Sequence, residues 1–184
     1  MNRYETMPKD LPKPIDDGAC DHLIGTKLPN IGLIATDDSM VNLPAQVRKT
    51  VVYCYPMTGK PGVPLPEGWD EIPGARGCTP QNCSFRDHYV ELSALGANIF
   101  GLSTQNSEYQ KEMVERLHLP FLVLSDVNFK FCDSMRLPTF EVNGVRLLKR
   151  VTLIAESNIV VKVHYPIFPS DSDAAWVIEQ LSHL

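Results

Sequence analysis

Residues 50–55, Thr50-Val-Val-Tyr-Cys-Tyr55, form a continuous run of apolar, β-branched and aromatic side chains that Pro56 closes. A short run without polar alternation is typical of a strand buried on both faces, as in a parallel sheet. We therefore expect a central strand here, in a sheet that carries helices on both of its faces.

The segments around this run alternate between strand and helix patterns. Asp37-Asp38-Ser39 is a turn signal, so residues 31–35 and 40–43 are expected to pair as an N-terminal hairpin. Apolar residues at helical spacing predict one helix over 79–95, which Gly96 ends. The remaining predicted elements are strand 97–102, helix 106–117, strand 121–124, helix 128–135, a hairpin of strands 145–154 and 159–165, and a last helix that begins at residue 170 or 171. This order predicts an α/β fold with a mixed central sheet.

The composition indicates one globular domain, with 184 residues, 43% hydrophobic and 21% charged. We expect an irregular, proline-rich arm over residues 1–22 and a single domain over 23–184. A formal net charge of −5 argues against nucleic acid as a partner. No apolar run approaches the roughly 18 residues of a membrane helix, so no membrane partner is expected. The first twenty residues show no apolar stretch of a secretory signal, and we expect a cytoplasmic protein.

Five cysteines in such a compartment are expected to be reduced. No Cys-x-x-Cys pair occurs and the five histidines are scattered singly, so the spacing of a zinc site is missing. We expect neither a metal nor another cofactor. Cys54 and Cys132 are interpreted as buried core residues, and the role of Cys20 in the arm stays open.

The segment from Pro56 to Pro80 holds six prolines and five glycines, too many for regular structure. A loop of this length in a compact domain is commonly functional or disordered. It delivers Cys78 to the start of the predicted helix, where free backbone N–H groups and the helix dipole favour a thiolate. Cys78 is therefore a candidate nucleophile. The alternative is a buried structural cysteine, the commonest state of a free cysteine.

Cys83 lies five residues further along the same predicted helix. In an intact helix, the Cα atoms of the two cysteines would be about 9 Å apart. A disulfide requires less than about 7 Å. The pair can bridge only if the first turns unwind, which Gly74, Gly77 and Pro80 make feasible. Oxidation of the pair would thus be coupled to local unfolding.

The residues around Cys78 resemble a known family. Gly77-Cys-Thr-Pro-Gln-Asn-Cys-Ser-Phe-Arg-Asp87, preceded by Tyr53-Cys-Tyr-Pro56, is similar to the peroxiredoxins (thiol peroxidases) of the peroxiredoxin Q type, which include the bacterioferritin-comigratory proteins. Residues 25–33, 97–103, 119–126 and 150–154 resemble further family segments in the same order. The resemblance covers about residues 24–183 and implies a thioredoxin-like fold.

The resemblance also implies roles for individual residues. Cys78 matches the peroxidatic cysteine and Cys83 the resolving cysteine. Arg150 matches the arginine that holds and polarises the peroxide; the alternative is a surface residue of the strand over 145–154. Pro56 matches the proline at the end of the strand before the active site.

The chain departs from the family signature before Cys78. The signature has a Thr or Ser three residues before the cysteine, where this chain has Ala75, and about fifteen residues are inserted between Pro56 and Cys78. Thr58 is the only hydroxyl residue in this insertion. We expect that it supplies the missing hydrogen bond; a plain turn residue is the alternative. One hypothesis for the insertion is that residues 61–69 form a lid over Cys78 that shapes the access of bulky hydroperoxides.

By resemblance, we expect a thiol peroxidase that reduces hydrogen peroxide and alkyl hydroperoxides. The Cys78 sulfenate would be resolved by Cys83, and a thioredoxin-like or glutaredoxin-like reductant would reduce the intrachain disulfide. Two alternatives stay open. One is a protein disulfide oxidoreductase of the same fold, which the lack of Cys-x-x-Cys disfavours. The other is a redox sensor or holdase-like protein without turnover, which Ala75 makes conceivable.

Overall fold

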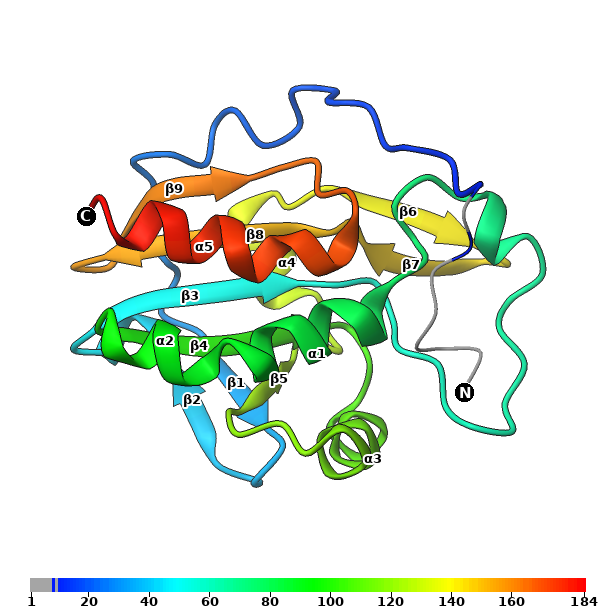
Figure 1. Ribbon diagram of the computed structural model, residues 1–184, viewed down its shortest axis with the longest axis horizontal. Coiled ribbons are helices and arrows are strands. Elements are labelled where there is room, and N and C mark those ends of the chain that lie inside the picture. The colour runs from blue at the N-terminus through cyan, green and yellow to red at the C-terminus, as the bar shows by residue number, and fades with distance from the viewer. Residues whose placement is uncertain (1–7, 9) are drawn as a thin grey trace.

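The described chain, residue 8 and residues 10–184 of a computed structural model, is built around a mixed sheet of seven strands (Figure 1). The strand order is β2-β1-β5-β4-β3-β8-β9. β3 is parallel to β4 and β4 to β5, while the other neighbours are antiparallel. The strands are β1 (Gly32–Ala35), β2 (Met40–Asn42), β3 (Lys49–Cys54), β4 (Ala97–Ser103), β5 (Val123–Ser125), β8 (Val151–Glu156) and β9 (Ile159–His164). The predicted mixed α/β sheet is confirmed.

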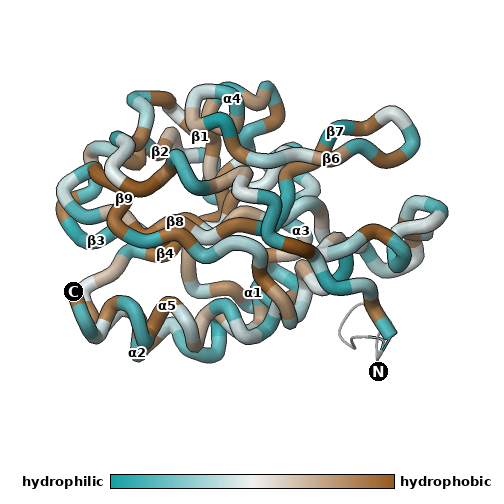
Figure 2. The backbone as a smooth tube through the Cα atoms, turned by 90° about the horizontal axis from the view of Figure 1, so that it is seen from above, coloured by the Kyte–Doolittle hydropathy of each residue, from teal (hydrophilic) through white to brown (hydrophobic). Residues whose placement is uncertain are grey.

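Helices cover both faces of this sheet, because successive side chains of β3 point to opposite sides. Val51 and Tyr53 lie in one core with residues of α1 (Cys78–Asp87), α2 (Tyr89–Ala94), α3 (Ser107–Leu117) and α5 (Asp173–Leu181). Val52 and Cys54 lie in the other core, which α4 (Lys130–Met135) covers. Figure 2 shows α1, α2 and α5 together on one side of the strands. The run at 50–55 is apolar throughout because both of its faces are buried.

Several predicted elements agree with the structure to within a few residues. β1 and β2 form the expected hairpin. α3 begins after Asn106, whose side chain accepts a hydrogen bond from the backbone N–H of Tyr109 at 2.8 Å. Short helices of one turn occur at η1 (Leu43–Ala45) and η3 (Ser170–Ser172), the second leading directly into α5.

The single helix predicted over 79–95 is wrong, because the structure has α1 and α2 instead. His88 separates them with φ −99° and ψ 6°, outside the helical region. Its Nδ1 atom lies 2.8 Å from the carbonyl oxygen of Ser84. Phe85 and Leu92 are nonetheless both buried in the same core. The apolar spacing continued across the break, which is why it suggested one helix.

The long strand predicted over 145–154 is also wrong. Residues Val145–Leu148 form β7, which pairs with β6 (Thr139–Val142) in a separate two-stranded sheet. The turn between them is Asn143-Gly144, both at positive φ, a strong hairpin signal that the sequence interpretation missed. The chain then crosses to β8 at residues 149–150. Arg150 therefore lies in the crossing between two sheets and not within a strand.

The insertion after Pro56 is ordered and packs on this additional hairpin. It contains η2 (Trp69–Glu71), and Trp69 and Ala75 share a small core with Val142 and Leu147 of β6 and β7. Figure 1 shows the insertion and the β6–β7 hairpin at the same end of the molecule. This end therefore has a small core of its own, separate from the two that flank the main sheet.

The predicted arm has neither helix nor strand in its described part, residue 8 and residues 10–22; residues 1–7 and 9 lie outside the described residues. Cys20 nevertheless lies in the core next to α4. The division between arm and domain at residue 22 stays a prediction. Among the described residues, none of the helices has both the length and the apolar character needed to span a bilayer.

Candidate active site

Cys78 is the first residue of α1 and is 4% exposed. Gly77 precedes it at φ 108°, a left-handed conformation that glycine adopts without strain. The Cys78 thiol donates to the carbonyl oxygen of Ala75 at 3.6 Å, and Nη2 of Arg150 lies 3.3 Å from the sulfur. The structure thus brings together two predicted site residues, Cys78 and Arg150, that are far apart in sequence.

The Arg150 guanidinium is fixed from two sides and is 4% exposed. Its Nη2 atom donates to the carbonyl oxygens of residues 74–76, each at 3.3 Å, and its Nη1 atom donates to Oε1 of Gln81. A buried cation in this position can stabilise charge that develops on a departing oxygen.

A buried carboxylate, Asp173 at the start of α5, orients Gln81 in turn. Gln81 Nε2 donates to Asp173 at 2.6 Å, Thr152 Oγ1 donates at 2.7 Å, and Nδ1 of His164 lies 2.8 Å away. A carboxylate can only accept and a guanidinium can only donate. The Gln81 amide therefore has one orientation that satisfies both neighbours, with its NH₂ group toward Asp173 and its oxygen toward Arg150.

Cys83 follows in the same helix, so the separation of about 9 Å expected from helix geometry applies. The first turn is fastened by Asn82, which donates to the carbonyl oxygen of Cys78 at 2.8 Å and accepts from the Tyr53 hydroxyl at 2.7 Å. Phe85, stacked on Tyr53 with ring centres 4.1 Å apart, anchors the following turn. All five cysteines are free thiols.

The insertion covers Cys78. A hollow of about 10 Å³ borders the cysteine, lined by Met57, Gly59, Leu65, Trp69 and residues 76–79. This volume is close to the minimum that holds one water molecule. Leu65 and Trp69 belong to the segment 61–69 and line this hollow together with Cys78, while its role as a lid stays a prediction.

The structure gives no support to a hydrogen bond between Thr58 and Cys78. Thr58 is fully buried, and its backbone N–H and hydroxyl both donate to Oε1 of Gln105, at 2.9 and 3.3 Å. Gln105 Nε2 donates back to the Thr58 carbonyl oxygen at 3.3 Å. Pro56 is buried at the end of β3, and its carbonyl oxygen accepts from Ser103 at 3.1 Å. Both residues thus fasten the start of the insertion to the end of β4.

A different hydroxyl lies in the Cys78 core. Tyr55 is fully buried there, and its hydroxyl has no hydrogen-bond partner among the described residues. Burial, and to a smaller extent the charge of the nearby Cys78, raises the pKa of Tyr55 well above its usual value. The Tyr55 hydroxyl therefore stays protonated and can donate a hydrogen bond.

The other cysteines are held as thiols by their surroundings. Burial raises the pKa of both Cys20 and Cys132 to about 12 and that of Cys54 well above its usual value. Thiols of this kind are poor nucleophiles at neutral pH. All three lie in the core opposite to that of Cys78. Across residue 8 and residues 10–184, no cluster of three or more His, Cys, Asp or Glu side chains is placed to hold a metal ion.

Sequence reasoning missed Gln81, Asp173 and Tyr55. Gln81 lies three residues after Cys78, so helical spacing could have placed the two on neighbouring positions of one face. Asp173 could not be found in this way, because its contact with α1 depends on how α5 docks on the sheet. Tyr55 was assigned to the strand as an apolar residue, and nothing in its spacing indicates an unpartnered hydroxyl.

Known proteins resemble this chain in sequence and in fold. Residues 23–178 match the Redoxin family model. The chain is 33% identical over 142 residues to a chloroplastic peroxiredoxin Q of Oryza sativa subsp. japonica, covering 77% of this chain and 58% of the relative's length. The structure superposes on Mycobacterium tuberculosis peroxidoxin BcpB with a TM-score of 0.72 at 21% identity, covering 88% and 97% of the two chains. For the Xanthomonas campestris bacterioferritin comigratory protein, the TM-score is 0.68 at 18% identity, covering 95% and 98%.

These matches confirm the predicted thioredoxin-like fold. The chain belongs to the Redoxin family and, within it, to the peroxiredoxins of the Q and bacterioferritin-comigratory type. It spans less than two thirds of the length of the rice relative. The activity of the whole protein is therefore a proposal that rests on the site itself.

Proposed function

We propose that this protein is a thiol peroxidase, with Cys78 as the peroxidatic and Cys83 as the resolving cysteine. The contact of 3.3 Å between the Arg150 guanidinium and the Cys78 sulfur carries the proposal. The thiolate attacks the terminal oxygen of the peroxide, so that an S–O bond forms and the O–O bond breaks. The departing oxygen leaves with the bonding electron pair, stabilised by Arg150, and takes up a proton to give water or an alcohol. Cys78 becomes a sulfenic acid.

Resolution requires the start of α1 to open. The sulfur of Cys83 attacks the sulfenic sulfur, a disulfide forms and water leaves. The link from Tyr53 through Asn82 to the Cys78 carbonyl must break first, while the stack of Phe85 on Tyr53 can keep the rest of α1 in place. We expect unwinding confined to residues 78–82 to bring the two sulfurs together.

The substrates we propose are hydrogen peroxide and alkyl hydroperoxides. The structure of the Xanthomonas protein was described in connection with its alkyl peroxide reduction activity, which supports the second class by analogy. A thioredoxin-like or glutaredoxin-like dithiol would reduce the disulfide by exchange. A reducing compartment such as the cytoplasm suits five free thiols. The rice relative is chloroplastic, whereas the cytoplasmic location is our proposal for this chain.

The direct test is consumption of hydrogen peroxide by the purified protein with thioredoxin, thioredoxin reductase and NADPH. We expect many turnovers per protein molecule, and peptide mass spectrometry of peroxide-treated protein should show a Cys78–Cys83 disulfide. Oxidation of one equivalent without turnover would instead indicate a redox sensor. Reaction with protein dithiols but not with micromolar peroxide would indicate a disulfide oxidoreductase.

The hydroxyl that replaces the one missing at Ala75 can be identified by two matched substitutions. Tyr55→Phe and Thr58→Val each remove a hydroxyl and little volume. We expect Tyr55→Phe to slow the reaction with hydrogen peroxide by about tenfold or more, because it removes a buried, unpartnered hydroxyl of the Cys78 core, and one donor to a charged group is worth about 1.5–3 kcal/mol. Thr58→Val should change it less, because its hydroxyl is bonded to Gln105. If stopped-flow measurements show a larger loss of rate for Thr58→Val than for Tyr55→Phe, Thr58 has the predicted role.

A further inference from the structure

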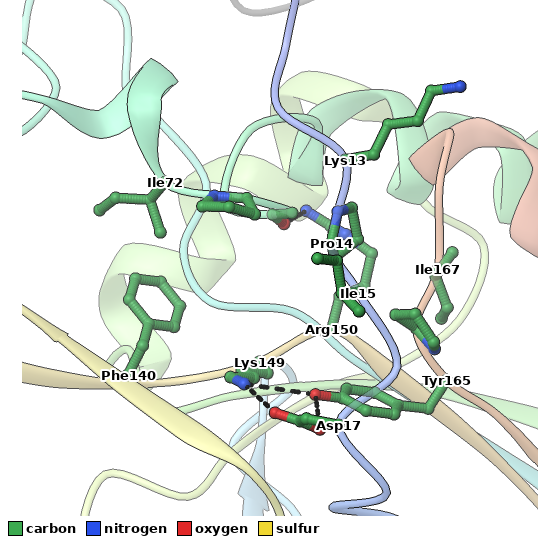
Figure 3. A pocket seen from close by; sticks show the side chains of 13 residues that line it. Lys13, Pro14, Ile15, Asp17, Ile72, Phe140, Lys149, Arg150, Tyr165 and Ile167 are labelled. Atoms are coloured by element: carbon green, nitrogen blue, oxygen red, sulfur yellow. Dashed lines mark hydrogen bonds and ion pairs between the residues drawn. The ribbon is translucent and has the colours of Figure 1, made fainter.

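The described part of the arm crosses a cavity of about 400 Å³ next to Arg150 (Figure 3). Arg150 forms part of the cavity wall and Cys78 does not, so the cavity lies behind the guanidinium as seen from the sulfur. The arm precedes the residues that match the Redoxin family model, which begin at residue 23. A role of the arm in this site would therefore not follow from membership of the family.

Three polar side chains hold the arm against the rest of the protein at this point. Lys149 Nζ donates to Asp17 at 2.7 Å and to the Tyr165 hydroxyl at 3.3 Å, and that hydroxyl donates to Asp17 at 2.8 Å (Figure 3). The hydrogen bonds from Lys149 and Tyr165 lower the pKa of Asp17 to about 2, so its carboxylate is ionised at neutral pH. These three side chains form a clamp that joins the arm, the crossing at residues 149–150 and the chain that follows β9.

The clamp is needed because apolar packing holds this part of the arm only weakly. Ile15, which lies between Pro14 and the clamp, is 84% exposed, and the cavity occupies space that side chains would otherwise fill. The ring of Tyr165, in contrast, packs against the core that α4 covers. The clamp therefore fastens a weakly packed segment to a well-anchored residue.

The arm supports Arg150 from two sides. The clamp holds Lys149, the neighbour of Arg150 in the crossing. Pro14 lies against Gly74, since a Cβ atom placed on Gly74 would be 3.5 Å from both Cβ and Cγ of Pro14. The Gly74 carbonyl oxygen accepts a hydrogen bond from Arg150 Nη2 at 3.3 Å. The arm thus contacts both the chain that carries the guanidinium and the loop that binds it.

The position of the guanidinium depends on this support, because its own hydrogen bonds leave it some freedom. Nη1 binds Gln81, but Nη2 reaches the carbonyl oxygens of residues 74–76 only at 3.3 Å, longer than the usual length of about 2.9–3.0 Å. Nε of Arg150 is buried and has no partner among the described residues. A shift of the crossing is therefore transmitted to the guanidinium.

We propose that Asp17 and Lys149 are positioning residues of the peroxidase: through the clamp, the arm keeps Arg150 where it can stabilise the oxygen that leaves during the reaction of Cys78. The proposal rests on the proposed thiol peroxidase function. The arm takes no part in the bond changes. Displacing it moves the guanidinium away from the place where negative charge develops, and the reaction slows.

The test reverses the two charges of the clamp, singly and together. The rate constant for the reaction of Cys78 with hydrogen peroxide is measured by stopped-flow for Asp17→Lys, for Lys149→Asp and for the variant with both substitutions. Because a misplacement of about 1 Å can cost about a hundredfold in rate, we expect each single reversal to slow the reaction by about tenfold. The double variant restores an attractive pair and should recover most of the rate.

A second comparison shows whether the clamp acts through Arg150. In protein that already carries Arg150→Lys, Asp17→Lys should cause little further loss, because no guanidinium is left to position. Tyr165→Phe removes one hydroxyl and no charge, and it should give a smaller loss than the charge reversals in a protein that keeps its fold. Asp133→Lys is the matched control and should leave the rate unchanged, since Asp133 of α4 forms a partly exposed ion pair of the same kind, with Arg146 at 2.8 Å.

Unchanged rates in both single reversals overturn the proposal. A loss of the same size with and without Arg150→Lys also overturns it, because the clamp then acts on the fold and not through Arg150. In both cases the unmodified protein still reduces hydrogen peroxide, so the thiol peroxidase function stands. If the unmodified protein does not reduce hydrogen peroxide, the proposed function itself is wrong and the role of the clamp falls with it.

Discussion

Cys78→Ser is expected to abolish peroxide consumption, whereas Cys83→Ser should still reduce one equivalent of peroxide and then stop. A serine hydroxyl at this position is not ionised at neutral pH and cannot be oxidised to a sulfenic acid, so the first step is lost. With Cys83 replaced, Cys78 still reacts but has no partner for the intrachain disulfide. The measurement is peroxide loss per protein molecule, combined with dimedone trapping of the sulfenic acid.

The matched control for these two variants is Cys20→Ala. Cys20 is buried in the opposite core and its pKa is raised to about 12, so its removal should leave turnover unchanged. Turnover by Cys83→Ser with thioredoxin present would mean that the reductant attacks the sulfenic acid directly. Activity retained in Cys78→Ser would contradict the assignment of the site as a whole.

These expectations depend on how α1 opens, and the sequence indicated only part of that. The breakers Gly74, Gly77 and Pro80 predicted that the start of the helix could unwind. A tertiary contact opposes this unwinding, because the Asn82 side chain accepts a hydrogen bond from Tyr53, a residue 29 positions earlier in the chain. No local pattern contains such a contact, because it exists only once β3 and α1 are packed together.

The same distinction explains which parts of the fold could be predicted. The strand at 50–55 and the hairpin around residues 37–39 follow from local composition, and both were found. The crossing from one sheet to the other at residues 149–150 was not predicted. Residues 145–148 and 151–154 are both largely apolar, and this pattern does not indicate which sheet each of the two segments joins. Asn143-Gly144 was the one local sign of the extra hairpin.

Arg150 was therefore predicted from resemblance as a strand residue, yet its place in the crossing is what lets it work. In a regular strand, the backbone of Arg150 would be hydrogen-bonded to the neighbouring strands of the sheet. In the crossing, its guanidinium reaches the carbonyl oxygens of residues 74–76 and the Cys78 sulfur together. The insertion, the extra hairpin and the arm all meet at this point, and residues from each line the cavity behind it.

Arg150→Lys is expected to slow the reaction of Cys78 with hydrogen peroxide by about a hundredfold, or about 2.7 kcal/mol of activation free energy. A lysine keeps the charge but not the planar fork, so it cannot bind Gln81 and the carbonyl oxygens of residues 74–76 while it also faces the sulfur. Asp173→Asn should give a smaller loss of about tenfold, because an asparagine amide can also donate, and Gln81 is no longer forced to turn its oxygen toward Arg150. Arg146→Lys, at an exposed pair with Asp133, is the control and should have no effect.

Alkylation by iodoacetamide distinguishes a catalytic loss from a disordered site. That reaction also needs the Cys78 thiolate, but it breaks no O–O bond and leaves no charged oxygen for Arg150 to stabilise. If Arg150 acts on the departing oxygen, Arg150→Lys slows the peroxide reaction much more than the alkylation. If both reactions slow by the same factor, Arg150 serves only to favour the thiolate. The network from Asp173 through Gln81 would then regulate ionisation of the sulfur and not cleavage of the peroxide.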